Sequence, residues 1–580
     1  MPVSVPTSDE FQSALATVQG QLDMLNGMVG DLNARVTALE AGTDPTPPDP
    51  PNPPLTTGRA CIITIGSQAH SFTQEAGTDL GDYVDLEGRF TQHCIASRCD
   101  TLPDWTVFFR PDADGKREEV VVEFGRCHNA ADQQYNGQAG VIPAYTVELR
   151  RDDAVLATLN VPKHYLYSRW RWQSAPRPVT VTVADLIARK LVPPIDGRLL
   201  PGMRAQVHAD DGPMMPNGIA TYMGMTGERD DIGIITESQA DYLIYEDDQA
   251  LGTVRAWLEG GGCFPMHERD ENTFAPIDFV NTYPMVTTYP NGYGEPQLPT
   301  YYTYEEEYSP DTAHRPELSY LPFLLTGDPY ALEQLQFHTT YDYCAQSRTK
   351  DFCMDFALRG YAWHLRSVAN CVVATPDNVP QWLQPKAYWQ KYLDMALEYT
   401  RSISVQMGPD TWQQRFRDIS VSLNSGGEVN CNMEEYAMSV YEYFVDLGMP
   451  GWEEIRNWKL PGVIARTDGK SGYNRSIPIA YVRQVACGSP TAAVCEDWKH
   501  LWDFNVQDDP TYYGDGDPTQ AHLAPSVNLG YATQTTACLN WALRQGCSEA
   551  TESQRWMTAE MTGRMQVLRW CVGATTGPGG

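Results

Sequence analysis

The chain has 580 residues, 42% of them apolar and 11% aromatic, which is enough to build large hydrophobic cores and excludes a disordered protein. About two or three globular domains are expected for this length. The net charge of −32 at pH 7 argues against a nucleic-acid partner, because binding a phosphate backbone requires a basic surface. No apolar run approaches the roughly 18 residues of a membrane-spanning helix, and the first basic residue is Arg35, so the sequence predicts neither a membrane span nor a secretory signal peptide.

The 14 cysteines are scattered along the chain, and their spacing matches neither a zinc site nor a repeated disulfide pattern. Without a secretory signal, we expect buried thiols that act as small apolar residues. Disulfide formation after release from a cell stays open. The sequence therefore predicts no metal site and no cofactor.

Residues 11–39 carry apolar side chains at alternating steps of four and three, which is the heptad pattern of a coiled coil. Its seam consists of Phe11, Leu15, Val18, Leu22, Leu25, Val29, Leu32, Val36 and Leu39. This mixture does not encode a dimer cleanly and is compatible with a homotrimer. The alternative is an amphipathic helix packed on the globular part, but such a helix normally shows a wider apolar face. We expect residues 1–42 to form a trimeric coiled-coil stem.

The next segment, residues 43–57, begins with the sequence TDPTPPDPPNPP. This much proline prevents strand pairing and helix formation and favours extended polyproline II geometry. We expect a stiff spacer between the stem and the folded body. The stem would then anchor the molecule at one end and present the body at the other.

Residues 58–197 predict a β-domain. Short runs such as CIITIG, VVVEF and YTVEL are separated by glycine, aspartate and asparagine. Asp152 and Asp153 lie where a hairpin turn would join residues 145–149 to residues 154–161. We expect a β-sandwich. Its last run, HYLYSRWRWQ, sets aromatic residues beside arginines, a pattern that could form a sugar-stacking platform but more often closes a core or a domain interface.

From residue 198 to residue 580 the pattern changes to helices with long polar connections. Residues 237–258 and 317–337 match each other as a helix, a tight acidic turn and a second helix, and residues 436–458 resemble a third copy. Further helices are expected at residues 357–373, 386–405, 523–544 and 553–570. Such pairs cannot bury a face alone, so they must stack, either as an open solenoid or as a closed α/α toroid.

The long, aromatic-rich insertion at residues 264–312 suits a toroid whose loops wall a cleft. The predicted fold class is therefore a multidomain α+β protein that consists of an N-terminal trimeric coiled coil, a β-sandwich and a C-terminal α/α toroid of helical hairpins. We expect residues 198–580 to form the toroid.

Three motifs carry a resemblance to known proteins. They are TGERDDIG at residues 226–233, HERD at residues 267–270, and AHRPEL at residues 313–318 followed by YLPFLLTGD. These motifs resemble uncharacterised α/α-toroid proteins encoded by bacteria and their tailed phages. The stem, proline stalk and β-domain that precede them are similar in layout to phage tail fibres and tailspikes.

The resemblance implies a virion protein that is assembled in the host cytoplasm and acts outside the cell. Its implied partners are a virion anchoring protein at the N-terminus and a host surface polysaccharide. Toroids of this kind include polysaccharide lyases and glycoside hydrolases, but no defining active-site motif of either class is matched here. The resemblance names a fold rather than a reaction, so catalysis stays open.

The helix expected from residue 357 places Arg359, Trp363 and Arg366 on one stripe beside its core stripe. An aromatic ring between two arginines suits an acidic sugar, because the ring stacks on the apolar face while a guanidinium holds the carboxylate. The alternative is a surface strip paired with the abundant acidic residues. Arg315 and His267, which lie in the shared motifs, are further candidates for substrate binding.

His314 and His522 each follow an alanine and are expected at helix starts, where the helix dipole favours a neutral imidazole that can act as a base. Proton abstraction beside a uronate carboxyl needs such a base, an arginine for the carboxylate and an acid, for which Tyr436 is a candidate. A hydrolase would instead need two carboxylic acids across a cleft. The candidate acids are Glu317, Glu434, Glu435 and Asp230. The alternative for all of these residues is a purely structural role.

These patterns favour a homotrimeric virion fibre or spike that binds a host surface glycan, with depolymerisation left open. A free cellular glycan-degrading enzyme is the second hypothesis, and the missing signal peptide weighs against it. A structural decoration protein without catalysis is the third. The sequence does not choose between the first and the third.

Overall fold

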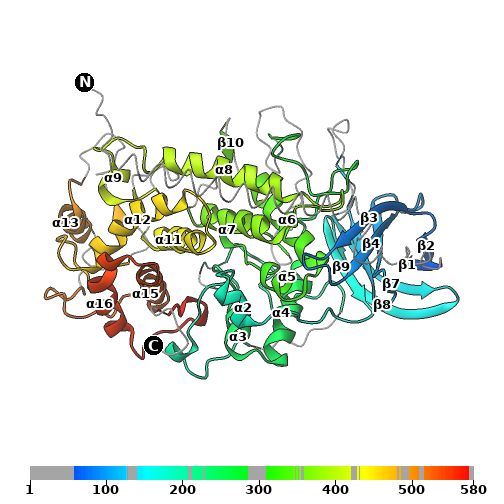
Figure 1. Cartoon of the computed structure of the whole chain (residues 1–580), viewed down its shortest axis with the longest axis horizontal. Coiled ribbons are helices and arrows are strands. Elements are labelled where there is room, and N and C mark those ends of the chain that lie inside the picture. The colour runs from blue at the N-terminus through cyan, green and yellow to red at the C-terminus, as the bar shows by residue number, and fades with distance from the viewer. Residues whose placement is uncertain are drawn as a thin grey trace, which may run out of the picture. The chain divides into compact units, whose positions relative to one another are not determined.

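The computed structural model divides the chain into two compact units, residues 1–56 and 57–580. The structure describes residues 58–125, 127–128, 140–206, 212–225, 227, 229–284, 286, 308–345, 348–349, 352–353, 358–419, 428–429, 431–479, 483–484, 495–508 and 515–573. The predicted stem and spacer, residues 1–57, lie outside the described residues. The described part is a mixed α+β fold, which confirms the α+β class (Figure 1).

Two antiparallel sheets form from the β-rich part of the chain. One has the strand order β2-β1-β7-β8 and the other the order β3-β4-β5-β6-β9. Their bounds are β1 Arg59–Ile65, β2 Gln68–Thr73, β3 Thr78–Val84, β4 Thr91–Ser97, β5 Trp105–Pro111, β6 Glu118–Phe124, β7 Val141–Arg151, β8 Ala154–Tyr165 and β9 Ser168–Gln173. The expected hairpin is present, since β7 pairs with β8 and Asp152 takes a left-handed conformation in the turn between them.

The central strands β5 and β6 are buried along their whole length. Successive side chains of a strand point to opposite faces, so both faces of these strands must be covered. Val107 and Val122 belong to an apolar cluster that they share with the four-stranded sheet. Phe108 and Val121 belong to a second cluster that they share with the helices. The expected boundary at residue 197 therefore falls within one compact unit.

Helices follow the sheets along the chain. The α-helices are α2 Val183–Ala188, α3 Glu237–Tyr245, α4 Asp248–Gly261, α5 Tyr320–Thr326, α6 Pro329–Cys344, α7 Leu358–Ala374, α8 Lys386–Ser402, α9 Trp412–Phe416, α11 Cys431–Asp446, α12 Trp452–Thr467, α13 Trp498–Asp508, α15 Leu529–Arg544 and α16 Thr551–Met561. The short 3-10 helices are η1 Gly197–Leu199, η2 Thr312–His314, η3 Ser548–Ala550 and η4 Leu568–Trp570. Among the helices, two-residue strands pair as β10 Arg348–Thr349 with β11 Phe352–Cys353, and as β12 Glu428–Val429 with β13 Arg483–Gln484.

The helix pairs expected from the internal repeat are present as α3–α4 and α5–α6. In each pair an aspartate caps the second helix: Asp247 Oδ1 accepts a hydrogen bond from the backbone N–H of Ala250 at 2.9 Å, and Asp328 Oδ1 accepts one from Tyr330 at 3.1 Å. This capping explains the acidic turn in the repeated sequence. The third expected pair is α11–α12.

Helix α7 packs against α6, α8 and α11 and is buried along almost its whole length (Figure 1). A helix that is buried all round belongs to the core rather than to the surface. The predicted binding residues on this helix, Arg359, Trp363 and Arg366, therefore have buried side chains.

A buried ion-pair network joins the five-stranded sheet to α6. Glu333 of α6 lies among three guanidinium groups, those of Arg110 on β5, Arg169 on β9 and Arg269 from the loop after α4. Arg269 also pairs with Glu123 of β6 at 2.6 Å. Burial alone would raise the pKa of Glu333, but the charges of Arg110, Arg269 and Arg169 outweigh it and hold the pKa well below its usual range.

Twelve cysteines whose side chains the structure describes carry free thiols, and all of these except Cys99 are buried. Burial raises the pKa of the Cys263 thiol to about 12, so it stays protonated and unreactive at neutral pH. This agrees with the expectation of buried thiols. None of the helices in the described segments is both long enough and apolar enough to cross a lipid bilayer.

Candidate functional site

The start of α7 brings several of the predicted residues together. Arg359 in the first turn of α7 contacts His314, which ends the 3-10 turn η2. The Arg359 side chain is buried, while the His314 side chain keeps 14% of its surface exposed. Asp311, which precedes the turn, is 39% exposed and completes a row of three side chains that runs from the interior to the surface.

The hydrogen bonds of this row define the tautomer of His314. Its Nε2 lies 2.5 Å from Nη2 of Arg359, and its Nδ1 lies 2.6 Å from Oδ1 of Asp311. A guanidinium only donates hydrogen bonds and an ionised carboxylate only accepts them. Nε2 of His314 must therefore accept from Arg359, and the ring proton on Nδ1 must be donated to Asp311. The geometry assigns a neutral imidazole whose Nε2 lone pair is its basic atom.

The segment around Gly227 covers this row from one side. A Cβ atom added to Gly227 would overlap Nη1 of Arg359, so a larger residue at this position would require the guanidinium to move. Tyr436 of α11 donates a hydrogen bond from Oη to the carbonyl of Gly227 at 3.1 Å. Arg229 donates from Nη2 to the carbonyl of His314 at 2.8 Å. These contacts tie the segment to η2, α7 and α11.

Two carboxylates at the site have shifted pKa values of opposite direction. Burial raises the pKa of Asp311, but the hydrogen bond from His314 and the charge of Arg359 outweigh it, so the pKa lies below its usual range. Burial also raises the pKa of Asp231, and in this case the ion pair with Arg229 at 2.9 Å compensates only in part. Asp311 is therefore ionised at neutral pH and holds His314 in the orientation described above.

Arg359 differs from most buried arginines of this protein in its partners. The other buried arginines, apart from Arg366, have a carboxylate within ion-pair distance; they are Arg59, Arg110, Arg169, Arg177, Arg269, Arg315, Arg456, Arg466 and Arg569. Among the described residues, no carboxylate lies within that distance of Arg359, and its buried Nε has no hydrogen-bond partner. Arg359 thus holds a positive charge beside a neutral imidazole.

Arg366 also lacks a carboxylate in the described part of the chain, but its environment is different. It donates to the carbonyls of Gly233 and Arg315 and to the hydroxyl of Ser367. Burial, and then the charge of Arg315, lower the pKa of Arg366 to about 9. Arg366 is completely buried and joins main-chain segments inside the fold, so it has no free surface for a ligand.

Trp363 does not form the exposed stacking platform expected from the sequence. Its side chain is completely buried, with the ring packed edge-on against Tyr436 at 4.9 Å and under the guanidinium of Arg366 at 5.0 Å. The sequence predicts that this stripe lies beside the core stripe of α7 and is open to a ligand or to solvent. Since α6, α8 and α11 surround α7, both sides are core.

Arg315 and Glu317 follow His314 directly but point into the interior. Arg315 is paired with Asp342 at 2.5 Å. Glu317 accepts hydrogen bonds from the backbone N–H groups of Ser319 and Tyr320 and from the side chain of Asn370. Both side chains are buried and their hydrogen-bonding groups are paired within the fold, so they stabilise the structure next to the site and do not bind a substrate.

The other candidate acids do not form a pair across a cleft. Glu434 is buried in an ion pair with Lys459, and Glu435 in one with Arg466. Asp230 is exposed. A hydrolase needs one acid that can give up a proton and one carboxylate that faces the substrate, and these side chains are not arranged in that way.

The remaining histidines lie away from the row. His267 is buried against Phe337 and His338, and burial, followed by the charge of Arg169, lowers its pKa well below the usual value. His522 is 78% exposed and lies 3.0 Å from Glu560. Neither His314 nor His522 begins a helix, since His314 ends a three-residue turn and His522 precedes α15 by several residues. The helix-dipole argument for these residues therefore does not hold.

Sequence reasoning selected His314, Arg359 and Tyr436 but missed two residues that complete the site. Asp311 orients the imidazole, and the spacing of aspartate three residues before histidine was the available signal. Gly227 lies in one of the motifs, but its contact with Arg359 joins two segments that are far apart in the chain. No sequence pattern shows such a contact.

Within the described ranges, no group of three or more histidine, cysteine, aspartate or glutamate side chains is arranged to hold a metal ion. The chemistry that the described residues offer at the site is that of a neutral imidazole, an ionised carboxylate and a guanidinium that has no carboxylate partner among them. Comparison of the chain with protein-family models, with curated proteins and with solved structures finds no match.

Proposed function

We propose that this protein is a virion appendage that binds a host surface polysaccharide, and that an acidic sugar of the polymer is held at Arg359. The observation that carries the proposal is the row Asp311–His314–Arg359, in which a buried guanidinium that has no carboxylate partner among the described residues is linked to the surface by a partly exposed histidine. An anionic group on a ligand would supply the charge that the described residues around Arg359 do not provide. Because the whole protein has a net charge of −32, its overall field repels anions, and the attraction for an anionic ligand comes only from the charge close to Arg359.

The same row supports proton abstraction as the chemistry of the site. In the free protein Nε2 of His314 accepts a hydrogen bond from Arg359, and a carboxylate that enters would compete for that guanidinium. Nε2 would then be free to take a proton from the carbon next to the carboxylate, while Asp311 keeps the ring in place. The electron pair of that C–H bond would form the C=C bond of the product as the bond to the glycosidic oxygen breaks, and that oxygen would take a proton from an acid. Tyr436 lies behind Gly227, and its hydrogen bond to that carbonyl would have to open before it could act as an acid. A lyase-type reaction is therefore better supported than hydrolysis.

The test is incubation of the full-length protein with the capsular polysaccharide of a host strain. The matched ligand is the same polymer after chemical reduction of its carboxyl groups to alcohols. We expect binding to the native polymer and loss of most of that binding with the reduced one. Ultraviolet absorbance of an unsaturated product would report a lyase, and new reducing ends without that absorbance would report a hydrolase.

Variants separate the roles of the two central residues. His314→Gln should keep binding and lose product formation, because the base is needed for turnover but contributes little to binding affinity. Arg359→Gln should lose binding. His522→Gln is the matched control, since His522 also contacts a carboxylate at 3.0 Å but lies elsewhere on the surface.

Three outcomes would change the proposal. If the wild type binds the polymer but forms no product, the protein would be an adhesin without catalytic activity. Equal binding to the native and the reduced polymer would show that Arg359 does not hold a carboxylate of the ligand. The absence of binding to any host glycan would favour a structural decoration protein.

The proposed architecture that goes with this function is a trimeric stem, a β-sandwich and an α/α toroid. The apolar cluster shared by the two sheets supports the sandwich, and the contacts within the pairs α3–α4, α5–α6, α11–α12 and α15–α16 support stacked hairpins. If the heptad seam drives association, a variant without residues 1–57 should be a folded monomer in light scattering. A trimeric truncated body would place the interface in residues 58–580.

A further inference from the structure

The outer edge of the five-stranded sheet borders an open groove with a volume of about 860 Å³. Strand β3 and the turn that follows it form one wall. Residues 376–381, which connect α7 to α8, form the other wall. None of the residues that line this groove belongs to the row at His314.

Strand β3 is the end strand of its sheet and pairs only with β4 among the described strands. The backbone N–H and C=O groups along its other edge therefore lack a ladder partner. A bulge between Asp79 and Asp82, where Gly81 has a φ of 82°, bends the strand. Val84 and Leu86 are 51% and 53% exposed, although large aliphatic side chains are mostly buried in this fold.

Both walls of the groove carry carboxylates. Asp79 and Asp82 lie on β3, and Asp377 lies on the opposite wall, 3.9 Å from Nζ of Lys386. His93 on β4 contacts both carboxylates of β3, with Nδ1 at 2.6 Å from Asp82 and Nε2 at 3.5 Å from Asp79. Histidine and lysine offset only part of this charge, so the groove is acidic.

We propose that this groove binds an extended, lysine- or arginine-bearing peptide segment of a partner protein, which adds to the sheet along β3. Main-chain hydrogen bonds to the free edge would hold the peptide, as in other cases of strand addition. Alternate side chains of the peptide would meet the aliphatic surface of Val84 and Leu86, and basic side chains would meet Asp82 and Asp377. The inference does not depend on the glycan site.

The lining of the groove favours a peptide over a sugar. Sugar sites usually offer an aromatic ring on which the sugar stacks, and none of the described residues that line this groove is aromatic. The charge also favours a cationic segment, because the acidic protein attracts basic partners and repels acidic ones.

The first test measures binding of short fluorescent peptides to the full-length protein by fluorescence anisotropy. The probe alternates lysine with threonine, and the matched peptide carries glutamate in place of lysine. A third peptide keeps the lysines but has N-methyl groups on the backbone nitrogens of one edge, which removes those donors. We expect salt-sensitive binding of the first peptide, no binding of the second and at least about tenfold weaker binding of the third.

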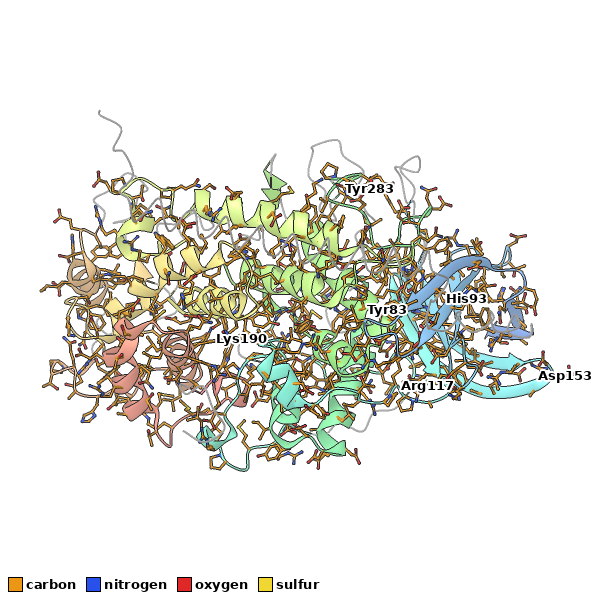
Figure 2. The ribbon with its side chains drawn as sticks, in the orientation of Figure 1. Tyr83, His93, Arg117, Asp153, Lys190 and Tyr283 are labelled. Atoms are coloured by element: carbon orange, nitrogen blue, oxygen red, sulfur yellow. The ribbon has the colours of Figure 1, made fainter. Side chains whose placement is uncertain are left out.

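Variants on the two walls then locate the site. Asp82→Asn and Asp377→Asn should each weaken binding about threefold, as expected for an exposed charge pair. Asp153→Asn is the matched control, because Asp153 lies at the free tip of the β7–β8 hairpin, away from His93 on β4 (Figure 2). Val84→Lys should also weaken binding, since it places a competing cation in the groove.

Hydrogen exchange of the wild-type protein provides a measurement that needs no variant. Backbone amides of residues 78–84 should gain protection when the lysine peptide is bound. The proposal is overturned if the N-methylated peptide binds as tightly as the first, if the wall variants leave affinity unchanged, or if residues 78–84 gain no protection. Displacement of the peptide by a neutral oligosaccharide would also overturn it and assign the groove to a glycan.

Discussion

Two of the buried regions that contain arginines differ in how the positive charge is balanced. Where the five-stranded sheet meets α6, three guanidinium groups surround Glu333, and the carboxylates of Glu119 and Glu123 supply two further negative charges. At the start of α7, Arg359 is almost as deeply buried, but it contacts a neutral imidazole and has no carboxylate partner in the described part of the chain. A paired buried charge serves the fold, whereas a buried charge without a counter-ion is a cost that a ligand can offset.

The largest effect is expected from breaking the neutralised region. Glu333→Gln would leave Arg110, Arg169 and Arg269 without their shared carboxylate, and the loss of a partner in a buried ion pair costs about 3–5 kcal/mol. The free energy of unfolding from urea titration measures this loss. Glu398→Gln is the control, since Glu398 is 65% exposed in its pair with Arg401 and should cost less than about 1 kcal/mol. A small effect at Glu333 would mean that the three arginines find other acceptors.

Trp363 lies one helical turn after Arg359 on α7 and belongs to the core. Trp363→Ala should therefore destabilise the protein by about 3–5 kcal/mol, the usual cost of removing a large buried ring. Trp363→Phe keeps much of the packing and should cost clearly less. The measurement is again urea unfolding. A stable, well-folded Trp363→Ala protein would show that the ring is not part of the core and would reopen the stacking role expected from the sequence.

Glu268 is the carboxylate counterpart of Arg359, because it is buried and no ion pair to it occurs among the described side chains. Burial raises its pKa to about 8. The folded state therefore keeps a proton that the unfolded chain releases, so its contribution to stability should fall as the pH rises from about 4.5 to 8.

Glu268→Gln removes this titration. The variant should gain stability relative to the wild type between pH 5 and 8 by on the order of 2 kcal/mol, which is less than the full shift would give at about 1.4 kcal/mol per pH unit. Unfolding free energies at several pH values measure the difference. A constant difference across this range would show that Glu268 is ionised in the folded protein.

The sequence predicted the α+β class, the β7–β8 hairpin and the helix pairs, because those features depend on local patterns such as alternation, turn residues and capping aspartates. It also selected His314 and Arg359. It did not predict that Trp363 is buried, because its ring is covered by Tyr436 of α11, a helix that α8 and α9 separate from α7 in the chain. It did not predict the contact of Gly227 with Arg359 for the same reason. Local patterns define elements, whereas burial depends on which elements pack together.

The smallest effect is expected at Arg359 itself. Arg359→Gln breaks no ion pair with a described residue and leaves no described carboxylate unpaired, and His314 can replace the lost hydrogen bond with solvent because it is partly exposed. The cost should be about 1 kcal/mol, the usual value of one hydrogen bond. Arg110→Gln is the matched variant in the neutralised region and should cost several times more, about 3–5 kcal/mol, because it removes a partner of Glu333. Urea unfolding of both variants under the same conditions measures the contrast, and equal losses would mean that Arg359 holds the fold together as Arg110 does and is not kept for a ligand.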